Sequence, residues 1–447
     1  SVLKQLVYYV GREKFFQGIN QYLNKYAYSN ATLADLLHEL EKASGRDLKA
    51  WSAKWLEESG INTIATEVEE NADGTIASLT LNQTAPAEHP VLRPHRLAVG
   101  FYDEDPATGK IVRTDRFELD VDGESTVVAA AAGKKRPAFI LVNDDDLTYT
   151  KLRFDADSLS FALANLQHFD DALARAVVWL SLWDMTRDGD LAAEKFIDTT
   201  LALLATETES TTFRYALSCM STTAWHYTAP DRRADVVKHV AKELWKLVIA
   251  APGGSDQQFQ LVTAYLGYGE EGDAEFAEHA QGLFDGSLIV AGLEIDNNFT
   301  WTIINALSSV KLIDQAGIDA QLAKRDTTEN REFALGAHAV RGDLTNMQLE
   351  AVARGFAATP RPDLAEPYAA KYYDVVDWVW KNKSFHMAEA LLEGLYPYYA
   401  DPATLVELGH RWLADHEDAD NALKRIVRGN VESSQRTLKV RDFNAAL

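Results

Sequence analysis

The sequence has a single cysteine and no long apolar run, and both shortages limit what the protein can be. Cys219 stands alone among 447 residues, which excludes an intrachain disulfide and a cysteine metal cluster and favours a reducing cytosol. No apolar run reaches the roughly 18 residues of a membrane-spanning helix. The 44 Lys and Arg against 67 Asp and Glu give a formal charge of −23. This charge argues against nucleic-acid and anionic-membrane binding. We therefore expect a cytoplasmic protein with no nucleic acid and no membrane as partner.

Motifs that carry catalysis are also missing. There is no Gly-x-Gly-x-x-Gly, no phosphate loop and no Gly-x-Ser-x-Gly nucleophile elbow. The nearest match to the zinc motif His-Glu-x-x-His begins at His38-Glu39, but Lys42 stands where the second imidazole belongs. We expect His38 to be solvated, because it lies opposite the apolar helix face. His410 and His416 are six residues apart and do not share a helix face, so they do not predict a chelating pair. The sequence therefore predicts no catalytic residue and no metal ligand, and it leaves the substrate-binding residues unknown.

Residues 33–62 predict two short helices. The first has one apolar face and a glycine at its end: Leu33, Leu36, Leu37, Leu40 and Gly45. The second is capped by Asp47, ends near Gly60 and carries an apolar stripe: Leu48, Trp51, Trp55 and Leu56. Spacing alone indicates a helical hairpin with an aromatic core.

The hydrophobic period changes between residues 62 and 153. Short apolar runs separated by turn residues predict seven strands: 64–68, 79–81, 97–101, 111–114, 117–121, 139–142 and 149–154. Seven short strands with no helix among them are typical of a β-sandwich.

The remainder of the chain predicts helices of 12 to 20 residues joined by short breaks, for example 170–187, 191–204, 212–227, 231–249, 298–312, 362–381 and 403–416. Such a series favours a HEAT-like superhelix of antiparallel pairs. Trp179 and Trp183 are four apart, which is more typical of core than of a ligand site. Trp378 and Trp380 are two apart and cannot face the same way, so one of them meets solvent or another domain.

The run Asn143-Asp144-Asp145-Asp146 invites comparison with calcium loops. It lacks the alternating ligand spacing, the glycine and the final glutamate of an EF-hand. We favour a turn whose carboxylates cap the chain as it enters the next element. A calcium-dependent binding sandwich is the alternative, and it requires calcium binding that Asp145→Ala abolishes.

A family resemblance runs along most of the chain. The ordered set Asp47-Leu48, Trp51, Trp55-Leu56 and Gly60-Ile61-Asn62 resembles the end of the thermolysin-like domain in M1 zinc aminopeptidases. Residues 1–7, 11–22, 88–96, 143–158 and 174–188 are also similar to this family, the last of them to actinobacterial-type aminopeptidase N. The resemblance implies a mainly α, multidomain chain. It would comprise the helical end of a thermolysin-like domain (1–62), a small β-sandwich (63–155) and a large HEAT-like α-superhelical domain (156–447).

The resemblance also implies a function. The parent enzyme would use one zinc ion to release single N-terminal residues from peptides, with its His-Glu-x-x-His and Gly-x-Met-Glu-Asn motifs outside this chain. This segment would close the active-site chamber and limit substrate access, with the catalytic half and peptide substrates as partners and no zinc of its own. Arg325, Arg331 and Arg341 are candidates for the peptide's far end, although surface charge is the favoured interpretation.

The chain begins at Ser1 with an amphipathic pattern already running, and its first Met is Met185. We therefore expect a cut fragment that is inactive alone and exposes the apolar faces of residues 1–62. The alternative is a stand-alone helical-repeat interaction scaffold without catalytic activity.

Overall fold

The computed structural model describes residues 2–270, 272–338, 346–358 and 360–446. These residues divide into two compact units, 1–185 and 186–447. The division falls within one helix, α6 (Ala172–Asp188). The domain boundaries at 62/63 and 155/156 stay predictions.

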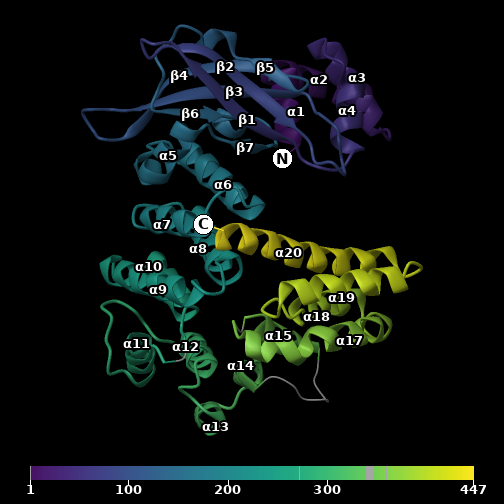
Figure 1. The fold of residues 1–447 in the computed structure, drawn as a ribbon. Coiled ribbons are helices and arrows are strands. Elements are labelled where there is room, and N and C mark those ends of the chain that lie inside the picture. The colour runs from purple at the N-terminus through teal and green to yellow at the C-terminus, as the bar shows by residue number, and fades with distance from the viewer. Residues whose placement is uncertain (1, 271, 339–345, 359, 447) are drawn as a thin grey trace. The chain divides into compact units, whose positions relative to one another are not determined.

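The first unit begins with helices and continues into strands (Figure 1). Its helices are α1 (Val2–Val10), α2 (Arg12–Lys25), α3 (Leu33–Ser44), α4 (Leu48–Leu56) and α5 (Ala156–Asn165). Its strands are β1 (Thr63–Glu70), β2 (Ile76–Thr84), β3 (His95–Glu104), β4 (Ile111–Val121), β5 (Ser125–Val127), β6 (Phe139–Val142) and β7 (Lys151–Arg153). Short helical turns lie at η1 (Ala129–Ala131), η2 (Asp144–Asp146) and η3 (Leu166–His168).

Local capping sets the bounds of α3 and α4. Thr32 and Asp35 form a reciprocal capping box at the start of α3, and Gly45 ends the helix in the left-handed region at φ 75°. Asp47 caps α4 by accepting from the Ala50 backbone N–H at 3.0 Å. The two-helix prediction is confirmed, but α4 ends at Leu56, before Gly60.

The strands form two small sheets. One has the order β5-β2-β1-β7 and is antiparallel except for the β1–β7 pair, and the other has the antiparallel order β4-β3-β6. The predicted strands 111–114 and 117–121 are one strand, β4. A bulge lies between Phe101 and Tyr102 in its register with β3, so the polar residues between the two apolar runs remain in the sheet. The short β5 was not predicted, since three residues give no readable period.

The regular structure in the described residues of the second unit is helical, and loops join its helices. Its helices are α7 (Ala193–Leu204), α8 (Ser210–Thr222), α9 (Arg233–Ala250), α10 (Asp256–Leu266), α11 (Ala274–Asp285), α12 (Asn297–Ser309), α13 (Gln315–Lys324), α14 (Thr328–His338), α15 (Asn346–Ala357), α16 (Pro362–Ala365), α17 (Ala369–Asn382), α18 (Phe385–Gly394), α19 (Pro402–Asp415) and α20 (Asn421–Ala445). A π-helical turn, η4 (Thr223–Tyr227), follows α8, and η5 (Glu366–Tyr368) lies between α16 and α17.

The helix predicted over 362–381 is interrupted. Pro367 lies in η5 and cannot donate the backbone hydrogen bond that a continuous helix needs, so α16 ends at Ala365 and α17 begins at Ala369. The chain is thus mainly helical with two small sheets.

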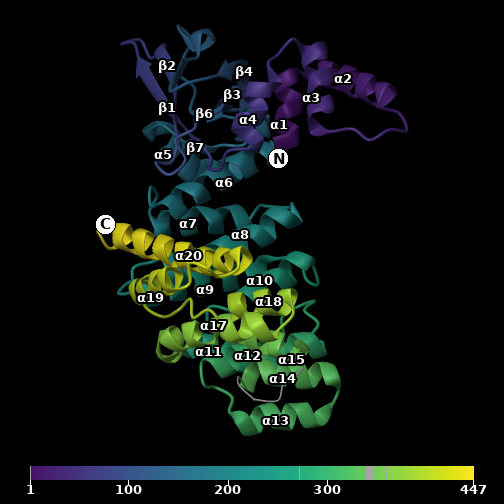
Figure 2. The same ribbon diagram turned by 90° about the vertical axis from the view of Figure 1, so that its right-hand side faces the viewer.

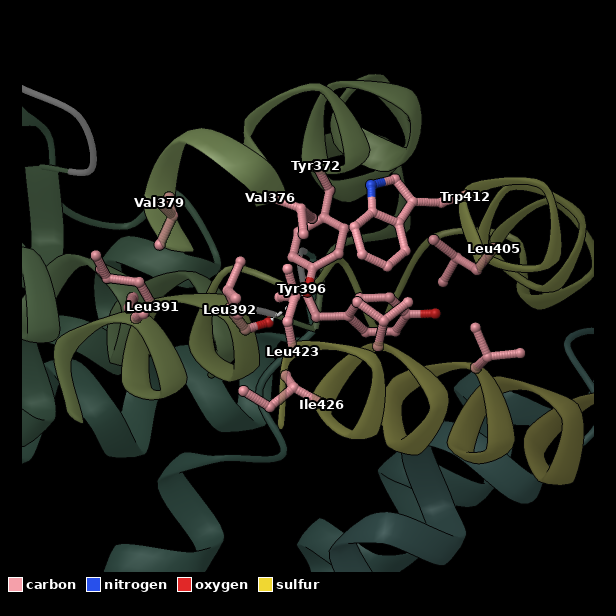
Figure 3. Packing of buried hydrophobic residues seen from close by; sticks show 14 of the residues in the cluster. Tyr372, Val376, Val379, Leu391, Leu392, Tyr396, Leu405, Trp412, Leu423 and Ile426 are labelled. Atoms are coloured by element: carbon pink, nitrogen blue, oxygen red, sulfur yellow. Dashed lines mark hydrogen bonds between the residues drawn. The ribbon is translucent and has the colours of Figure 1, made fainter. Parts of the chain in front are cut away.

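Helices α17 to α20 share one well-filled core (Figure 3). Tyr372, Tyr396, Leu405 and Trp412 are buried there among aliphatic side chains. The Tyr372 hydroxyl donates to the Leu392 backbone carbonyl at 2.7 Å, so its polar group has a partner inside the core. Trp412 Nε1 is buried without a hydrogen-bond partner, so apolar packing is the main contribution to this core.

Candidate functional site

The first four helices expose a large share of their apolar side chains. Six large apolar residues are exposed within the described residues 2–62: Leu3, Phe16, Leu23, Tyr28, Leu33 and Leu56. Phe16 and Leu23 are seven positions apart on α2, so they project from the same face of that helix. The expectation that residues 1–62 expose apolar faces is confirmed. Leu56, which was placed on the buried stripe, lies outside the core instead.

The opposite side of these helices is packed. Helices α2 and α3 lie side by side in Figures 1 and 2, and Gly18 permits their close approach. A Cβ at Gly18 would lie 2.8 Å from Leu40 Cδ2. Gly18 is the one buried residue of α2, whose residues are all described. A small core lies behind it, formed by Leu6, Val10, Leu37, Leu40, Leu48, Trp51 and Trp55. Helix α2 therefore packs on α3 through Gly18, and its Phe15 and Ile19 side chains contact the small core while remaining partly exposed.

Arg93 ties α4 to the segment before β3. Its guanidinium donates to three backbone carbonyls at the end of α4: from Nε to Lys54 at 2.9 Å, and from Nη2 to Glu58 at 2.9 Å and Ser59 at 2.8 Å. The same group lies 5.5 Å from the Trp55 ring centroid, and Trp55 Nε1 donates to the Pro94 carbonyl at 3.1 Å. These bonds satisfy the carbonyls that a helix end leaves free. The end of α4 is thus tied to the segment before β3.

A buried polar network continues this junction to α1. His95 is fully buried, with Nε2 2.8 Å from Gln83 Oε1 and Nδ1 2.7 Å from Thr148 Oγ1. Gln5 Oε1 accepts the Tyr149 backbone N–H at 3.0 Å. Burial, reinforced by the charge of Arg93, lowers the pKa of His95 to about 3, so the ring is neutral at pH 7. The network around His95 therefore joins α1, through Gln5, to the strands.

The turn at 143–146 uses its carboxylates differently from our prediction. Asn143, Asp145 and Asp146 have positive φ, which confirms a tight turn. Asp144 is buried and accepts from Tyr102 Oη and from Arg113 Nη1, each at 2.6 Å. The capping role predicted for these carboxylates is therefore wrong, because Asp144 and Asp145 pair with residues of β3 and β4, and Asp146 pairs with Lys4 of α1 at 3.0 Å.

Asp145 also pairs with arginines, accepting at 2.9 Å from both Arg113 and Arg116. Gly100 leaves room for the turn, since a Cβ there would lie 2.8 Å from the Asp144 carboxylate. Cations of the chain itself thus occupy the carboxylates that the calcium alternative required. The turn joins β3, β4 and the chain after β6.

The histidine predictions agree with the structure. His38 is exposed. Its neighbour Glu39 is buried and accepts from Lys25 Nζ at 2.6 Å, which lowers the pKa of Glu39. His410 contacts Gln435, whereas His416 stacks on Trp412 and contacts Asp377 at 3.0 Å. The last two histidines have separate partners and do not form a pair.

The tryptophan predictions also hold. Trp179 and Trp183 are buried, which confirms a core role. Trp378 is 58% exposed, whereas Trp380 packs against the core of α17 to α20.

The arginine candidates remain without a peptide role. Arg325 and Arg331 are exposed, and Arg331 Nη2 pairs with Asp326 at 2.7 Å, as expected of surface charge. Arg341 lies outside the described residues.

The junction residues Arg93 and His95 received no role from sequence patterns. Both lie in the stretch 88–96, whose similarity to the aminopeptidases was the available signal. Their hydrogen-bond partners come from other parts of the chain, so no local spacing could identify them.

Comparison with known proteins places the chain in a family. Residues 139–436 match the ERAP1-like C-terminal domain, and residues 1–55 match the peptidase family M1 domain. The chain therefore belongs to the family of the ERAP1-like C-terminal domain, whose model matches more than half of it, and its first 55 residues match the M1 peptidase domain. The resemblance noted in the sequence is thereby confirmed.

Several aminopeptidases are similar to this chain. Aminopeptidase N of Streptomyces lividans is 36% identical over 100% of the chain, which covers 54% of that protein. Aminopeptidase M1-B of rice (Oryza sativa subsp. japonica) is 26% identical over 36% of the chain and 18% of its own length. Probable aminopeptidase 1 of Sulfurisphaera tokodaii is 38% identical over 15% of the chain and 9% of its own length. The chain thus spans about half the length of the Streptomyces relative.

Zinc is the metal that the M1 family implies. Within the described ranges, no three His, Cys, Asp or Glu side chains gather closely enough to hold a metal ion. The described residues do not fit a zinc ion, and we assign no catalytic step to them. A membrane-crossing helix, long and apolar enough, was not found among the described residues.

Proposed function

We propose that this chain is the access-controlling portion of an M1 zinc aminopeptidase that releases single N-terminal residues from peptides. Residues 1–62 would complete the thermolysin-like catalytic domain, 63–155 would form a β-sandwich spacer, and 156–447 a HEAT-like superhelix that closes the active-site chamber. The zinc ion and the amine-binding strand would belong to the partner half. Occlusion would favour exopeptidase action, because only a flexible peptide terminus enters a closed chamber.

The observation that carries this proposal is that the whole of this chain aligns with aminopeptidase N of Streptomyces lividans, together with the M1 match over residues 1–55. The exposed face of α2 supports it, because Phe16 and Leu23 project from a helix that has one buried residue. A catalytic half seated on this face would bury both side chains, each worth about 1.5–3 kcal/mol. The partners we propose are therefore that half and peptide substrates, and the compartment is the cytoplasm.

The test combines this chain with a separately expressed zinc-binding half of the Streptomyces lividans aminopeptidase N. Alone with stoichiometric zinc, the chain should not hydrolyse aminoacyl-nitroanilides, because it lacks the metal ligands. Mixed with the other half, it should associate and restore turnover. Zinc-dependent turnover by the chain alone would refute the proposal, as would failure of the two halves to associate.

A matched pair of variants locates the interface. The double variant Phe16→Ser, Leu23→Ser should weaken association at least tenfold, because it removes the exposed apolar face of α2. The control Gln17→Ser alters an exposed polar residue of the same helix and should leave association unchanged. Equal behaviour of the two variants would move the interface away from α2.

A further inference from the structure

A groove lies between α18 and α20 in the second unit. It has a volume of about 390 Å³, and the residues that line it are Glu389, Glu393, Tyr398, Arg425, Ile426, Gly429 and Asn430. Glu389 and Glu393 are four positions apart on α18, so they project from the same face of that helix. Arg425 and Gly429 have the same spacing on α20. The groove is therefore bounded by a carboxylate-bearing face of one helix and a glycine-bearing face of the other.

Gly429 leaves this groove open. It is an interior residue of α20, where glycine is less favourable than alanine because it has more backbone freedom to lose. Its φ is not positive, and a Cβ built on it would meet no heavy atom within 4 Å apart from its own helix backbone. Gly409 on α19 differs, since a Cβ there would overlap Val431 Cγ2. Neither backbone conformation nor packing requires glycine at 429, and the space above it is available to a ligand.

The lining of the groove is negatively charged and rich in hydrogen-bond acceptors. Glu389 pairs with Arg425 Nη2 at 3.2 Å, whereas Glu393 forms no ion pair with any residue that the structure describes. The Tyr398 hydroxyl donates to Asn430 Oδ1 at 2.8 Å, so this hydroxyl can only accept from a ligand. Glu393 also lies in the last turn of α18, at the negative end of the helix dipole. A ligand that fits must bring positive charge and hydrogen-bond donors.

The other lining groups indicate an organic cation. Asn430 is buried, and its Nδ2 donates to Tyr372 Oη at 3.0 Å and to the Leu392 carbonyl at 3.3 Å, so it has no donor left for an anion. Within the described ranges, no three His, Cys, Asp or Glu side chains gather closely enough for a metal ion, and calcium requires about six to eight oxygen ligands. Ile426, which packs in the core of α17 to α20, adds apolar surface for an alkyl chain.

We propose that the groove between α18 and α20 binds a primary alkylammonium ion. Its three N–H groups would donate to Glu389, Glu393 and Tyr398 Oη, and hydrogen bonds from a cation to a carboxylate are short and strong. Its alkyl chain would lie over Gly429 against Ile426. A free amine and the lysine side chain of a peptide both carry this group. The inference stands on the second unit alone and does not depend on the proposed role in an aminopeptidase.

Titration calorimetry of the whole chain with butylammonium chloride, in a buffer free of other primary amines, tests the groove. We expect saturable binding that Glu393→Gln weakens at least tenfold. Arg425→Gln should tighten binding several-fold, because it removes the cation that competes for Glu389. The control Glu407→Gln alters a glutamate that pairs with Arg411 on α19, outside the groove, and should bind like the unmodified chain.

Gly429→Leu separates binding from folding. Leucine is more favourable than glycine in a helix interior, and its side chain would occupy the groove. This variant should lose affinity for butylammonium at least tenfold, while its thermal unfolding temperature stays unchanged or rises. Binding equal to that of the unmodified chain, by either Gly429→Leu or Glu393→Gln, would overturn the site.

A second arm distinguishes the sources of the ammonium group. A tripeptide with a central lysine and blocked termini is compared with the same peptide carrying norleucine in place of lysine. If the lysine peptide displaces butylammonium, the ligand is a lysine side chain; if it does not while butylammonium binds, the ligand is a free amine. Displacement by the norleucine peptide as well would overturn the proposal, as would the absence of saturable binding by both butylammonium and the lysine peptide.

Discussion

The helices of residues 2–62 and helices α17 to α20 differ in how much of their apolar side-chain surface is buried. In the first set, one residue of α2 is buried, and Phe16 and Leu23 project outward. In the second set, α17 to α20 enclose aromatic and aliphatic side chains with satisfied hydroxyl groups (Figure 3). Stability of a helix in a protein comes mainly from packing of its apolar face. The comparison shows that α2 buries one residue, whereas α17 to α20 bury a continuous core and leave Val375, Trp378 and Phe385 exposed at its edge.

Amide hydrogen exchange should reveal the largest difference between these regions. Amides of α2 should exchange roughly 100-fold faster than those of α19, because α2 buries one residue and α19 buries four, including Leu405 and Trp412. Exchange measured by mass spectrometry on the isolated chain gives both values at once. Equal protection would break the comparison, and slow exchange in α2 only after addition of a catalytic half would sharpen it.

Two leucines with the same burial allow a matched test of packing. Leu40 and Leu405 are both fully buried, so Leu40→Ala and Leu405→Ala each remove the same atoms and should cost about 2–5 kcal/mol. Leu40→Ala should release α2 and α3 locally, whereas Leu405→Ala should shift the main unfolding transition. Limited proteolysis near Lys25 and thermal unfolding separate the two outcomes.

The control for this pair is Leu23→Ala, which alters an exposed residue of α2 and should change stability by less than about 0.5 kcal/mol. If Leu40→Ala lowers only the temperature of the main unfolding transition, residues 2–62 unfold cooperatively with the rest of the chain, and the expected local opening is contradicted.

Two histidines give a smaller, pH-dependent effect, one in each unit: His95 is fully buried and His226 is half-buried. Burial lowers the pKa of His95 and of His226 from 6.5 to about 3. Between these values the unfolded chain binds a proton that the folded chain does not. Stability contributed by each neutral ring is therefore complete above pH 6.5 and is lost as the pH falls toward 3. The slope approaches about 1.4 kcal/mol per pH unit for one proton.

His95→Gln and His226→Gln should each remove one such slope, measured by urea unfolding between pH 6.5 and 5. The exposed His38→Gln is the control and should leave the slope unchanged. A slope that neither of these two variants alters would contradict the neutral state of both rings.

Much of the architecture could be predicted because its causes are local. Thr32, Gly45 and Asp47 set helix bounds through capping, and short apolar runs at 97–101 and 139–142 identified strands. The two wrong predictions of element bounds also have local causes. A bulge joined two predicted strands into β4, and Pro367 divided a predicted helix.

The candidate sites were less predictable, because their residues meet only after folding. Arg93 binds carbonyls more than thirty positions away, and Arg425 meets Glu389 across 36 positions. The run 143–146 was visible as an acidic turn, but its arginine partners on β4 were not.

The sequence by itself determined the element types, the family and the shortage of metal-binding and catalytic motifs, since caps, periods and motifs are properties of neighbouring residues. Tertiary structure alone decided which apolar face stays uncovered and which charges stay uncompensated. Covering an apolar face or pairing a charge requires side chains that are distant in the sequence, and only the folded chain brings those side chains together.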